Sequence, residues 1–325
     1  MALPRLGDVM PLYLTEADVD ALGDMELALA AVEGAFDRQG RGVAGNVGRR
    51  RATVPAGSLN VMGGADQELG AAGAKIYGSF GGGARFVVVL FDVASGSLRA
   101  VIEAGRLGEL RTGAASGISS KYLAKSGSRV VGLIGSGRQA RTQLEALNGV
   151  HELAEVRVYS RNPVNVENYV KTMRERVDAE LVSCTSAAEA VRGADIVVTA
   201  TTAAGPVLLA DDLEPGMHVV AMGSNNPVHG EVDAAAVARV DRVFVDDLDG
   251  AHVEGGDLMA AERAGVLQWG QVIELGQVVA GRVPGRTADD EITLFASQGI
   301  ALWDIAMAQA VVERAEAAGR GTQVP

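Results

Sequence analysis

The 325-residue sequence predicts an α/β protein in which a doubly wound parallel sheet is joined to a second, α+β domain. Three observations lead to this fold class. A glycine-rich turn links a strand-like apolar run to a helical pattern at residues 129–140, strand-like and helix-like segments then alternate to about residue 300, and a helix followed by consecutive strand-like segments comes first. Because the glycine-rich turn starts near residue 130, a segment of domain size precedes it.

The first domain is predicted from its helices and the strand-like segments that follow them. Thr15 can cap a short helix, and residues 25–39 have the amphipathic spacing of a longer one. The strand-like segments, separated by glycine-rich turns, lie near residues 50–62, 71–80, 84–92 and 97–104. Consecutive strands with tight turns predict an antiparallel sheet. Residues 106–125 are predicted to form a helix that leads into the glycine-rich turn.

The glycine-rich turn has the features of a dinucleotide site. Gly135 permits a tight turn, Gly137 allows the backbone to approach a pyrophosphate, and the small Ala140 lets helix and strand pack closely. The amide groups and the positive dipole end of the new helix then face the anion. A later strand-like run at residues 194–201 fits a wall of the same sheet, so this part of the chain predicts a Rossmann domain.

The residues after the second strand of this domain bear on the choice of cofactor. The strand at residues 155–159 ends in Ser160 and Arg161, about 20 residues past the glycines, where an NAD site normally places Asp or Glu. A carboxylate would repel a 2′-phosphate, whereas an arginine binds one through its planar fork. The missing acid favours NADP(H), with NAD(H) possible. The alternative is that Arg161 is a solvated residue after a strand.

Composition excludes several classes. The net charge is −12 without any basic block, which argues against a nucleic-acid partner. No apolar run approaches the ~20 residues of a membrane span, and the chain starts without a signal-like stretch. The single cysteine, Cys184, cannot form an internal disulfide, and the four histidines lack metal-site spacing, so no metal is expected. These features predict a cytoplasmic protein with no membrane partner.

Cationic side chains of the first domain are candidates for substrate binding. They are Arg49, Arg50, Arg51, Lys75 and Arg111. Arg offers bidentate recognition of a carboxylate and Lys adds a point charge, so a cluster of them would suit a carboxylate ligand. The alternative is that they are solvated surface charges.

Several segments, taken together, resemble the ornithine cyclodeaminase/mu-crystallin family. In order along the chain they are Gly73-Ala-Lys75-Ile76, Leu110-Arg-Thr-Gly-Ala-Ala-Ser116, Gly135-Ser-Gly-Arg-Gln-Ala140, Val158-Tyr-Ser-Arg161, Ala194-Asp-Ile-Val-Val-Thr-Ala-Thr201, Gly216-Met-His-Val-Val-Ala-Met-Gly-Ser224, Glu231-Val-Asp233 and Asp290-Glu-Ile-Thr-Leu-Phe-Ala-Ser-Gln-Gly299. They are specific as a set, although no single one is.

The resemblance implies a domain organisation. The Rossmann domain would occupy residues 117–301, and a substrate-binding and dimerisation domain would combine residues 1–116 with 302–325. The last helix, roughly 298–318, would then return to the first domain. A homodimer and a small carboxylate substrate, an imino or amino acid, are also implied.

The resemblance further implies roles for individual residues. Lys75, Arg111 and an arginine on an early strand would hold the substrate carboxylate. Arg49 fits that arginine best and Arg51 comes second, because a slip of strand register moves side chains to the other face. Lys75 is also the candidate proton donor to an imine nitrogen, since burial can bring a lysine pKa toward neutrality. The predicted catalytic residues are Lys75, Arg111 and Asn225, and the predicted substrate-binding residues are Arg49, Asn60, Lys75 and Arg111.

The predicted cofactor-binding residues lie at the glycine-rich turn, at the ends of later strands and before the last helix. They are Thr112, Gly135, Ser136, Gly137, Arg138, Gln139, Ala140, Ser160, Arg161, Thr201, Gly223, Ser224, Asn225, Ser297 and Gly299. Residues 293–299 would wall the nicotinamide, and Asn225 would orient the substrate nitrogen or a water.

Two departures from the family pattern narrow the substrate. Similar cyclodeaminases carry Glu where this chain has Asn60 and Asp where it has Asn225, and that Asp is implicated in handling protons and the distal amine. Asparagine can neither take a proton nor offer a negative charge to an ammonium group. The loss of both acids argues against ornithine or lysine and favours a substrate with a neutral side chain.

These features predict an NADP(H)-dependent imine reductase or amino-acid dehydrogenase acting on CH–NH bonds. One alternative is a cyclodeaminase with substituted acids, which would release ammonia without net consumption of cofactor. The other is a crystallin-like protein that holds NADPH and a small carboxylate with negligible turnover.

Overall fold

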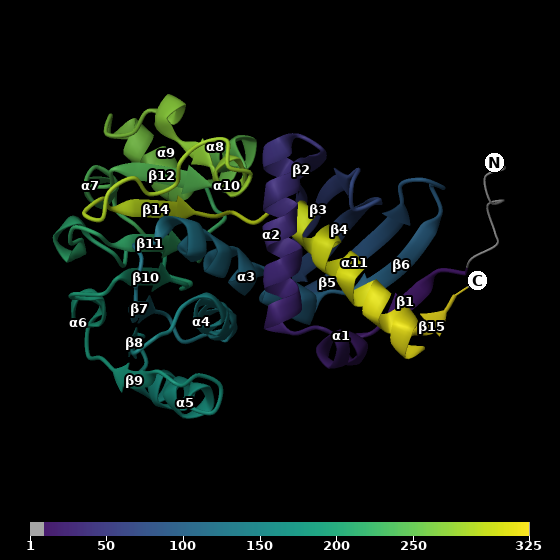
Figure 1. Ribbon diagram of the computed structural model, residues 1–325, viewed down its shortest axis with the longest axis horizontal. Helices are drawn as coiled ribbons and strands as arrows, with labels where there is room; N and C mark the ends of the chain where they lie inside the picture. The colour runs from purple at the N-terminus through teal and green to yellow at the C-terminus, as the bar shows by residue number, and fades with distance from the viewer. Residues whose placement is uncertain (1–9, 325) are drawn as a thin grey trace. The chain divides into compact units, whose positions relative to one another are not determined.

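The computed structural model describes residues 10–324, which form two compact units (Figure 1). The first unit runs up to Arg111 and resumes at Ile300, and the second unit is the continuous segment Thr112–Gly299. The predicted fold class is confirmed, because the second unit contains a parallel sheet and the first a mixed sheet with helices. Among the described residues, no helix is both long and apolar enough to cross a bilayer.

The first unit is built on a seven-stranded sheet with the order β15-β1-β6-β5-β4-β3-β2. Its strands are β1 (Leu12–Leu14), β2 (Ala44–Val54), β3 (Gly57–Asp66), β4 (Ala71–Phe80), β5 (Gly83–Asp92), β6 (Leu98–Glu103) and β15 (Thr322–Gln323). The strands from β2 to β6 form an antiparallel meander, as expected. The short β1 runs parallel to β6 and makes the sheet mixed.

One strand prediction was wrong. The segment near residues 50–62 is not a single strand, because the chain turns at residues 55–56 and the two sides belong to β2 and β3. Pro55 cannot donate to a strand ladder. Gly57 has a φ of 145°, and an ideal Cβ there would lie 2.1 Å from the carbonyl oxygen of Ser79, so only glycine fits. The proline and glycine carried the turn signal within an otherwise strand-like run.

Helices cover one face of this sheet. They are α1 (Glu16–Leu22), α2 (Met25–Arg41) and α11 (Ala301–Ala318), while α3 (Gly105–Leu123) begins in this unit and ends in the second. Thr15 caps α1 as predicted, in a capping box with Asp18. Helix α11 packs on α2 and on β2 to β5 (Figure 1). Helix α11 is therefore part of the first unit.

Strand alternation gives the sheet two different faces. Met62 and Lys75 are cross-strand partners on the face toward α11, and a Cβ on Gly64 of the same face would lie 3.1 Å from Cδ1 of Ile305. The opposite face exposes large apolar side chains of β2, β3 and β5, namely Val47, Leu59, Val61 and Phe91.

The second unit is built on an eight-stranded parallel sheet with the order β13-β12-β14-β11-β10-β7-β8-β9. Its strands are β7 (Val130–Ile134), β8 (Glu155–Tyr159), β9 (Glu180–Ser183), β10 (Ile196–Thr199), β11 (His218–Ala221), β12 (Arg242–Val245), β13 (Ile273–Glu274) and β14 (Thr293–Ala296). The order proceeds outward from β7 through β8 to β9, then reverses to β10 and β11. This reversal is the switch point at which such sheets bind ligands, outside the carboxyl ends of their strands.

The connections of the second unit are mostly helical, as in other doubly wound sheets. The helices are α4 (Arg138–Val150), α5 (Pro163–Met173), α6 (Ala187–Val191), α7 (Ala234–Val237), α8 (Leu248–Glu254), α9 (Gly256–Arg263) and α10 (Leu275–Val279), with 3₁₀ turns at η1 (Ala210–Asp212) and η2 (Trp269–Gln271). Neighbouring parallel strands require crossover connections of this kind, and such crossovers are right-handed in nearly all proteins.

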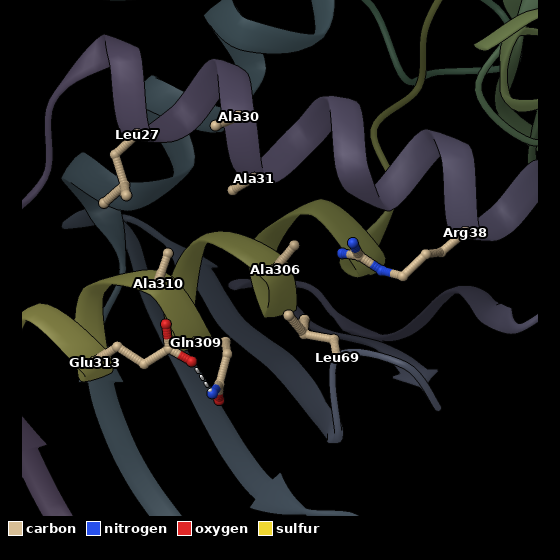
Figure 2. A pocket seen from close by; sticks show the side chains of 9 residues that line it. All are labelled: Leu27, Ala30, Ala31, Arg38, Leu69, Ala306, Gln309, Ala310 and Glu313. Carbon is tan, nitrogen blue, oxygen red and sulfur yellow. Dashed lines mark hydrogen bonds between the residues drawn. The ribbon is translucent and has the colours of Figure 1, made fainter. Parts of the chain in front are cut away.

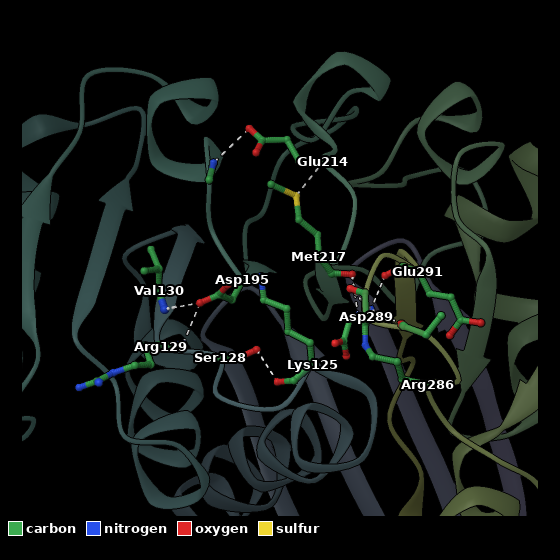
Figure 3. Close-up of polar contacts among 12 residues, drawn as sticks. Lys125, Ser128, Arg129, Val130, Asp195, Glu214, Met217, Arg286, Asp289 and Glu291 are labelled. Atoms are coloured by element: carbon green, nitrogen blue, oxygen red, sulfur yellow. Dashed lines mark hydrogen bonds and ion pairs between the residues drawn. The ribbon is translucent and has the colours of Figure 1, made fainter.

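Polar contacts fix the amino ends of the strands in the second unit (Figure 3). Asp195 accepts hydrogen bonds from the backbone N–H groups of Arg129 and Val130 and pairs with Lys125 at 2.7 Å. Arg286 donates to the carbonyls of Leu123 and Met217 at 2.7 and 3.1 Å. These bonds join the end of α3 to the amino ends of β7, β10 and β11.

Candidate functional site

Lys75, Arg111 and Asp304 meet in the first unit. The Nζ atom of Lys75, in the middle of β4, donates to Oδ1 of Asp304 at 2.7 Å. The Nε atom of Arg111, on α3, donates to the same oxygen at 3.2 Å. The three residues are 3%, 7% and 0% exposed. One carboxylate oxygen of α11 therefore holds two buried cations from two other elements.

A β-bulge brings Arg49 to the same face. The β2–β3 register pairs Val47 with Gly63 and Arg50 with Val61, so residues 48 and 49 together oppose Met62, the cross-strand partner of Lys75. Arg49 is 8% exposed, and its charge acts on Lys75.

The other two predicted cations lie differently. Arg51 is the register partner of Asn60 and Arg50 is the partner of Val61, and both arginines are exposed. Burial therefore distinguishes Arg49, Lys75 and Arg111 from the solvated charges that the sequence left as an alternative. Asn60 is buried and donates through Nδ2 to Oγ of Ser58 at 3.1 Å.

The surroundings of Lys75 favour loss of its proton. The pKa of Lys75 is lowered to about 8. Burial is the main cause, and the charges of Arg111 and Arg49 act in the same direction, whereas the carboxylate of Asp304 raises the pKa. The ring of Phe86 lies 5.2 Å from Nζ, and the ring of Trp303 lies 5.6 Å from Cζ of Arg111. A lysine whose pKa is near neutrality can both hold and release a proton at physiological pH.

Sequence reasoning missed Asp304, which connects the two cations. Asp304 lies in the first turn of α11, where the helix dipole by itself accounts for an acid. A signal was nevertheless present: Asp304 is the only ionisable residue between residues 301 and 312, where all neighbours but Gln309 are apolar. A single acid on a wholly apolar helix segment is rarely left without a partner.

The glycine-rich turn of the second unit has the shape a dinucleotide requires. Gly135 has a φ of 126°, and a Cβ there would lie 2.3 Å from the carbonyl oxygen of Ala200, so a larger residue is excluded. Helix α4 starts immediately afterwards, and its N-cap Gly137 provides no side-chain bond to the first amides. Gly137, Arg138 and Gln139 are exposed, whereas Ala140 is buried. The exposed amides at this helix start suit a pyrophosphate.

Helix α3 packs closely on α4 beside this turn. A Cβ on Gly113 would lie 2.3 Å from the carbonyl oxygen of Thr142, so the glycine permits the contact. The carbonyl oxygen of Thr112 accepts a hydrogen bond from Nε2 of Gln143 at 3.4 Å. Thr112, a predicted cofactor residue, is thus attached to the helix that begins at the glycine-rich turn.

Ser160 and Arg161 follow β8 at the same edge of the sheet as the glycine-rich turn. Arg161 is exposed, and the next residue, Asn162, caps α5 by accepting from the amide of Val164 at 3.0 Å. No carboxylate stands at residues 160–162, the positions that an NAD site would use for the ribose.

Two buried carboxylates hold the remaining predicted cofactor loops. Glu231 accepts from the amides of Thr201 and Gly223, both at 2.7 Å, and from the hydroxyl groups of Thr199 and Thr201. Burial raises the pKa of Glu231, against the opposing effect of these hydrogen bonds. A Cβ on Gly223 would lie 2.3 Å from the carboxylate, so the contact requires glycine. The loops after β10 and β11 are therefore joined through one side chain.

Asp246, which follows β12, holds the loop after β14 in a similar way. Its Oδ2 atom accepts from the hydroxyl of Ser297 at 2.7 Å and from the amides of Gln298 and Gly299 at 3.0 and 2.6 Å. These bonds hold the chain extended after β14, so α11 starts at Ala301 and not at residue 298 as expected. Burial raises the pKa of Asp246 to about 6. The sequence assigned no role to Glu231 or Asp246.

The last predicted residues of this edge are less enclosed. Ser224 donates through Oγ to the carbonyl oxygen of His229 at 2.9 Å, and Asn225 beside it is exposed. Both lie in the loop after β11, the strand next to β10 in the sheet.

A cavity of about 220 Å³ lies elsewhere in the first unit (Figure 2). Its lining comes from α2, α11 and the β3–β4 turn, and consists of Leu27, Ala30, Ala31, Arg38, Leu69, Ala306, Gln309, Ala310 and Glu313. None of these is a predicted site residue, so the cavity is not part of the cluster around Lys75.

A family model and solved structures match almost the whole chain. The model described as the ornithine cyclodeaminase/mu-crystallin family matches residues 10–319. The chain is similar to the structure of Thermococcus litoralis Δ1-pyrroline-2-carboxylate reductase in complex with NADH and L-proline, with a TM-score of 0.92 and 32% identity over 96% of this chain and 100% of the other.

Two further structures are equally similar. An archaeal alanine dehydrogenase dimer with bound NAD has a TM-score of 0.92 and 33% identity, over 98% of this chain and 99% of the other. The iminosuccinate reductase of Paracoccus denitrificans in complex with NAD⁺ has a TM-score of 0.92 and 32% identity, over 98% and 100%. These relatives are nicotinamide-dependent imine reductases and an amino-acid dehydrogenase.

Proposed function

The chain belongs to the ornithine cyclodeaminase/mu-crystallin family, and from that premise we propose that it is an NADP(H)-dependent oxidoreductase that reduces the C=N bond of a small imine carboxylate. The observation that carries this proposal is the buried cluster in which Asp304 holds Lys75 beside Arg111, with Arg49 close by. It combines cations that can bind a carboxylate with a lysine that can donate a proton.

The residues of the second unit fit a dinucleotide. The steric need for glycine at Gly135 and the uncapped amides at the start of α4 are the supporting observations. The residues that would hold the cofactor are Gly135 to Ala140, Ser160 and Arg161, and the loops that contain Thr201, Gly223 and Ser297. When bound, the nicotinamide supplies the hydride that reduces the imine carbon.

Side chains of the protein would bind the substrate and protonate the imine nitrogen. Arg49, Lys75 and Arg111 would bind the substrate carboxylate, with Arg51 as the second candidate for the early arginine. Lys75 would donate a proton from Nζ to the imine nitrogen as the carbon is reduced, so that one N–H bond forms and one Nζ–H bond breaks. The neutral lysine then takes a proton from solvent. Asn225 would orient the substrate nitrogen or a water.

We further propose NADP(H) over NAD(H), although the three similar structures contain NADH, NAD or NAD⁺. Arg161 offers a guanidinium where a 2′-phosphate would lie, and no acid stands nearby in sequence to repel it. The neutral side chains Asn60 and Asn225 favour an imine whose side chain is uncharged over one derived from a diamino acid.

The protein is proposed to act as a homodimer. The sheet of the first unit exposes Val47, Leu59, Val61 and Phe91 on the face away from α11, and an apolar patch of this kind is a common protein interface. One similar structure is a dimer. Light scattering after size exclusion should report two chains, and Val61→Asp should shift the population toward one.

The direct test is to follow the absorbance of NADPH and of NADH with cyclic five- and six-membered imine carboxylates, and with pyruvate plus ammonia or methylamine. Oxidation of NADPH by any imine supports the proposal. Oxidation by none contradicts it. Ammonia release from ornithine or lysine without net cofactor consumption would then support a cyclodeaminase, and tight NADPH binding without turnover would support a crystallin-like binding protein.

A further inference from the structure

Asp304 is a buried carboxylate shared by two cations of the first unit. It is fully buried on α11, and its Oδ1 atom accepts from both Lys75 and Arg111. Its Oδ2 atom has no hydrogen-bond partner among the described residues. A buried carboxylate is unfavourable unless it is compensated. Beside the dipole at the first turn of α11, the side chains that pair with Asp304 among the described residues are Lys75 and Arg111, the two proposed substrate-binding cations.

We propose that Asp304 is a positioning residue that keeps Lys75 protonated and holds it at a fixed spacing from Arg111. This inference rests on the proposed function, because it concerns the lysine that would protonate the imine. The geometry supports it directly: a single oxygen atom bridges donors on β4 and α3, so the two cations cannot separate without breaking a bond to Asp304.

The charged groups that face Lys75 act in opposite directions. Arg49 from β2 and Arg111 from α3 disfavour the charged lysine, as burial does, and Asp304 from α11 favours it. The residues paired with Lys75 across the sheet, Met62 on β3 and Val88 on β5, carry no charge. Among the groups that the structure places against Lys75, Asp304 is therefore the one that favours the protonated form of the lysine.

The chain is well suited to a direct measurement, because it has only four lysines. The full-length protein labelled with ¹³C at the lysine ε-carbon should give few signals, and Lys75→Arg would assign the one of interest. Its titration should show a pKa near 8 in the unaltered protein. Asp304→Asn, which keeps size and removes charge, should increase the acid dissociation constant of Lys75 by about tenfold or more.

Two further variants make the result specific. Glu316→Gln removes an exposed acid from the same helix and should leave the titration of Lys75 unchanged. Asp304→Glu keeps the charge and should hold the pKa of Lys75 near its original value; it also provides a test if Asp304→Asn does not fold. The proposal would be overturned if the pKa of Lys75 is unchanged in Asp304→Asn. It would also be overturned if the pKa of Lys75 falls as far in Asp304→Glu as is expected for Asp304→Asn.

Activity separates this inference from the proposed function. In Asp304→Asn the basic limb of kcat/KM for imine reduction should move to lower pH by the same amount as the Lys75 titration, while NADPH affinity stays unchanged. If the NMR shift occurs but no imine is reduced by any variant, the proposed function fails and the assignment of Asp304 stands. If imines are reduced and the titration does not move, the proposed function stands and the assignment of Asp304 fails.

Discussion

The two units of this protein use buried carboxylates in opposite ways. In the first unit, Asp304 faces two cations, and no backbone amide donates to it in the described structure. In the second unit, Glu231 and Asp246 face backbone amides and hydroxyl groups of loops. The first arrangement controls where a proton resides, and the second controls the shape of a loop. The same kind of side chain therefore acts on the charge state of a lysine in one unit and on the shape of loops in the other.

The largest effect should come from the cation cluster. Lys75→Met keeps most of the side-chain volume and removes the proton donor, so kcat for imine reduction should fall about a hundred- to ten-thousand-fold. NADPH binding, followed by its fluorescence, should stay close to that of the unaltered protein. Lys171→Met, at an exposed position of α5, is the matched control. Turnover within a few-fold of normal in Lys75→Met would remove this lysine from the chemistry.

The acid after β12 should show its effect in stability. The folded-state pKa of Asp246 is raised from 3.8 to about 6, so its contribution to stability is fully present below about pH 4 and is lost as the pH rises through about 6. The free energy of unfolding of the unaltered protein, relative to Asp246→Asn, should therefore decrease by about 3 kcal/mol between about pH 4 and pH 7. Urea denaturation at several pH values measures it. A difference independent of pH would mean that Asp246 titrates like an exposed acid.

The acid that joins two loops should act on cofactor binding. The amides of Thr201 and Gly223 donate to different oxygens of Glu231, so Glu231→Gln leaves one of them facing an NH2 donor in place of an acceptor, which costs about 1–3 kcal/mol. The Kd for NADPH should rise about tenfold or more, while the pKa of Lys75 remains unchanged. Glu175→Gln, at an exposed position, is the control. Unaltered NADPH affinity would show that the loops keep their shape without this carboxylate.

The smallest effect should come from an exposed side chain. Arg161→Asp replaces a guanidinium by a carboxylate and should shift preference from NADPH toward NADH by about tenfold, since solvent screens the charge at this position. The ratio of kcat/KM for the two cofactors measures it. Arg161→Asn, which removes the charge without adding repulsion, should lie between. A variant that keeps its preference for NADPH would assign 2′-phosphate recognition to other residues.

Most elements of the fold could be predicted from short sequence patterns. The glycine-rich turn is encoded within a few residues, because the left-handed φ of Gly135 and the start of α4 follow directly from the neighbouring sequence. The cap of α1 was predictable for the same reason, because the capping box involves only Thr15 and Asp18, three residues apart. The single strand expected near residues 50–62 was wrong, because the turn at residues 55–56, between Val54 and Gly57, divides that segment into β2 and β3.

The sequence by itself determined the two kinds of sheet, the dinucleotide turn and the candidates Lys75 and Arg111. Only the tertiary structure decided what surrounds them. Asp304 reaches Lys75 across 229 positions and Arg111 across 193, and a bulge in β2 turns Arg49 toward the same lysine. The physical reason is that a turn depends on adjacent dihedral angles, whereas the charge state of a buried group depends on desolvation and on charges that distant segments bring within a few ångströms.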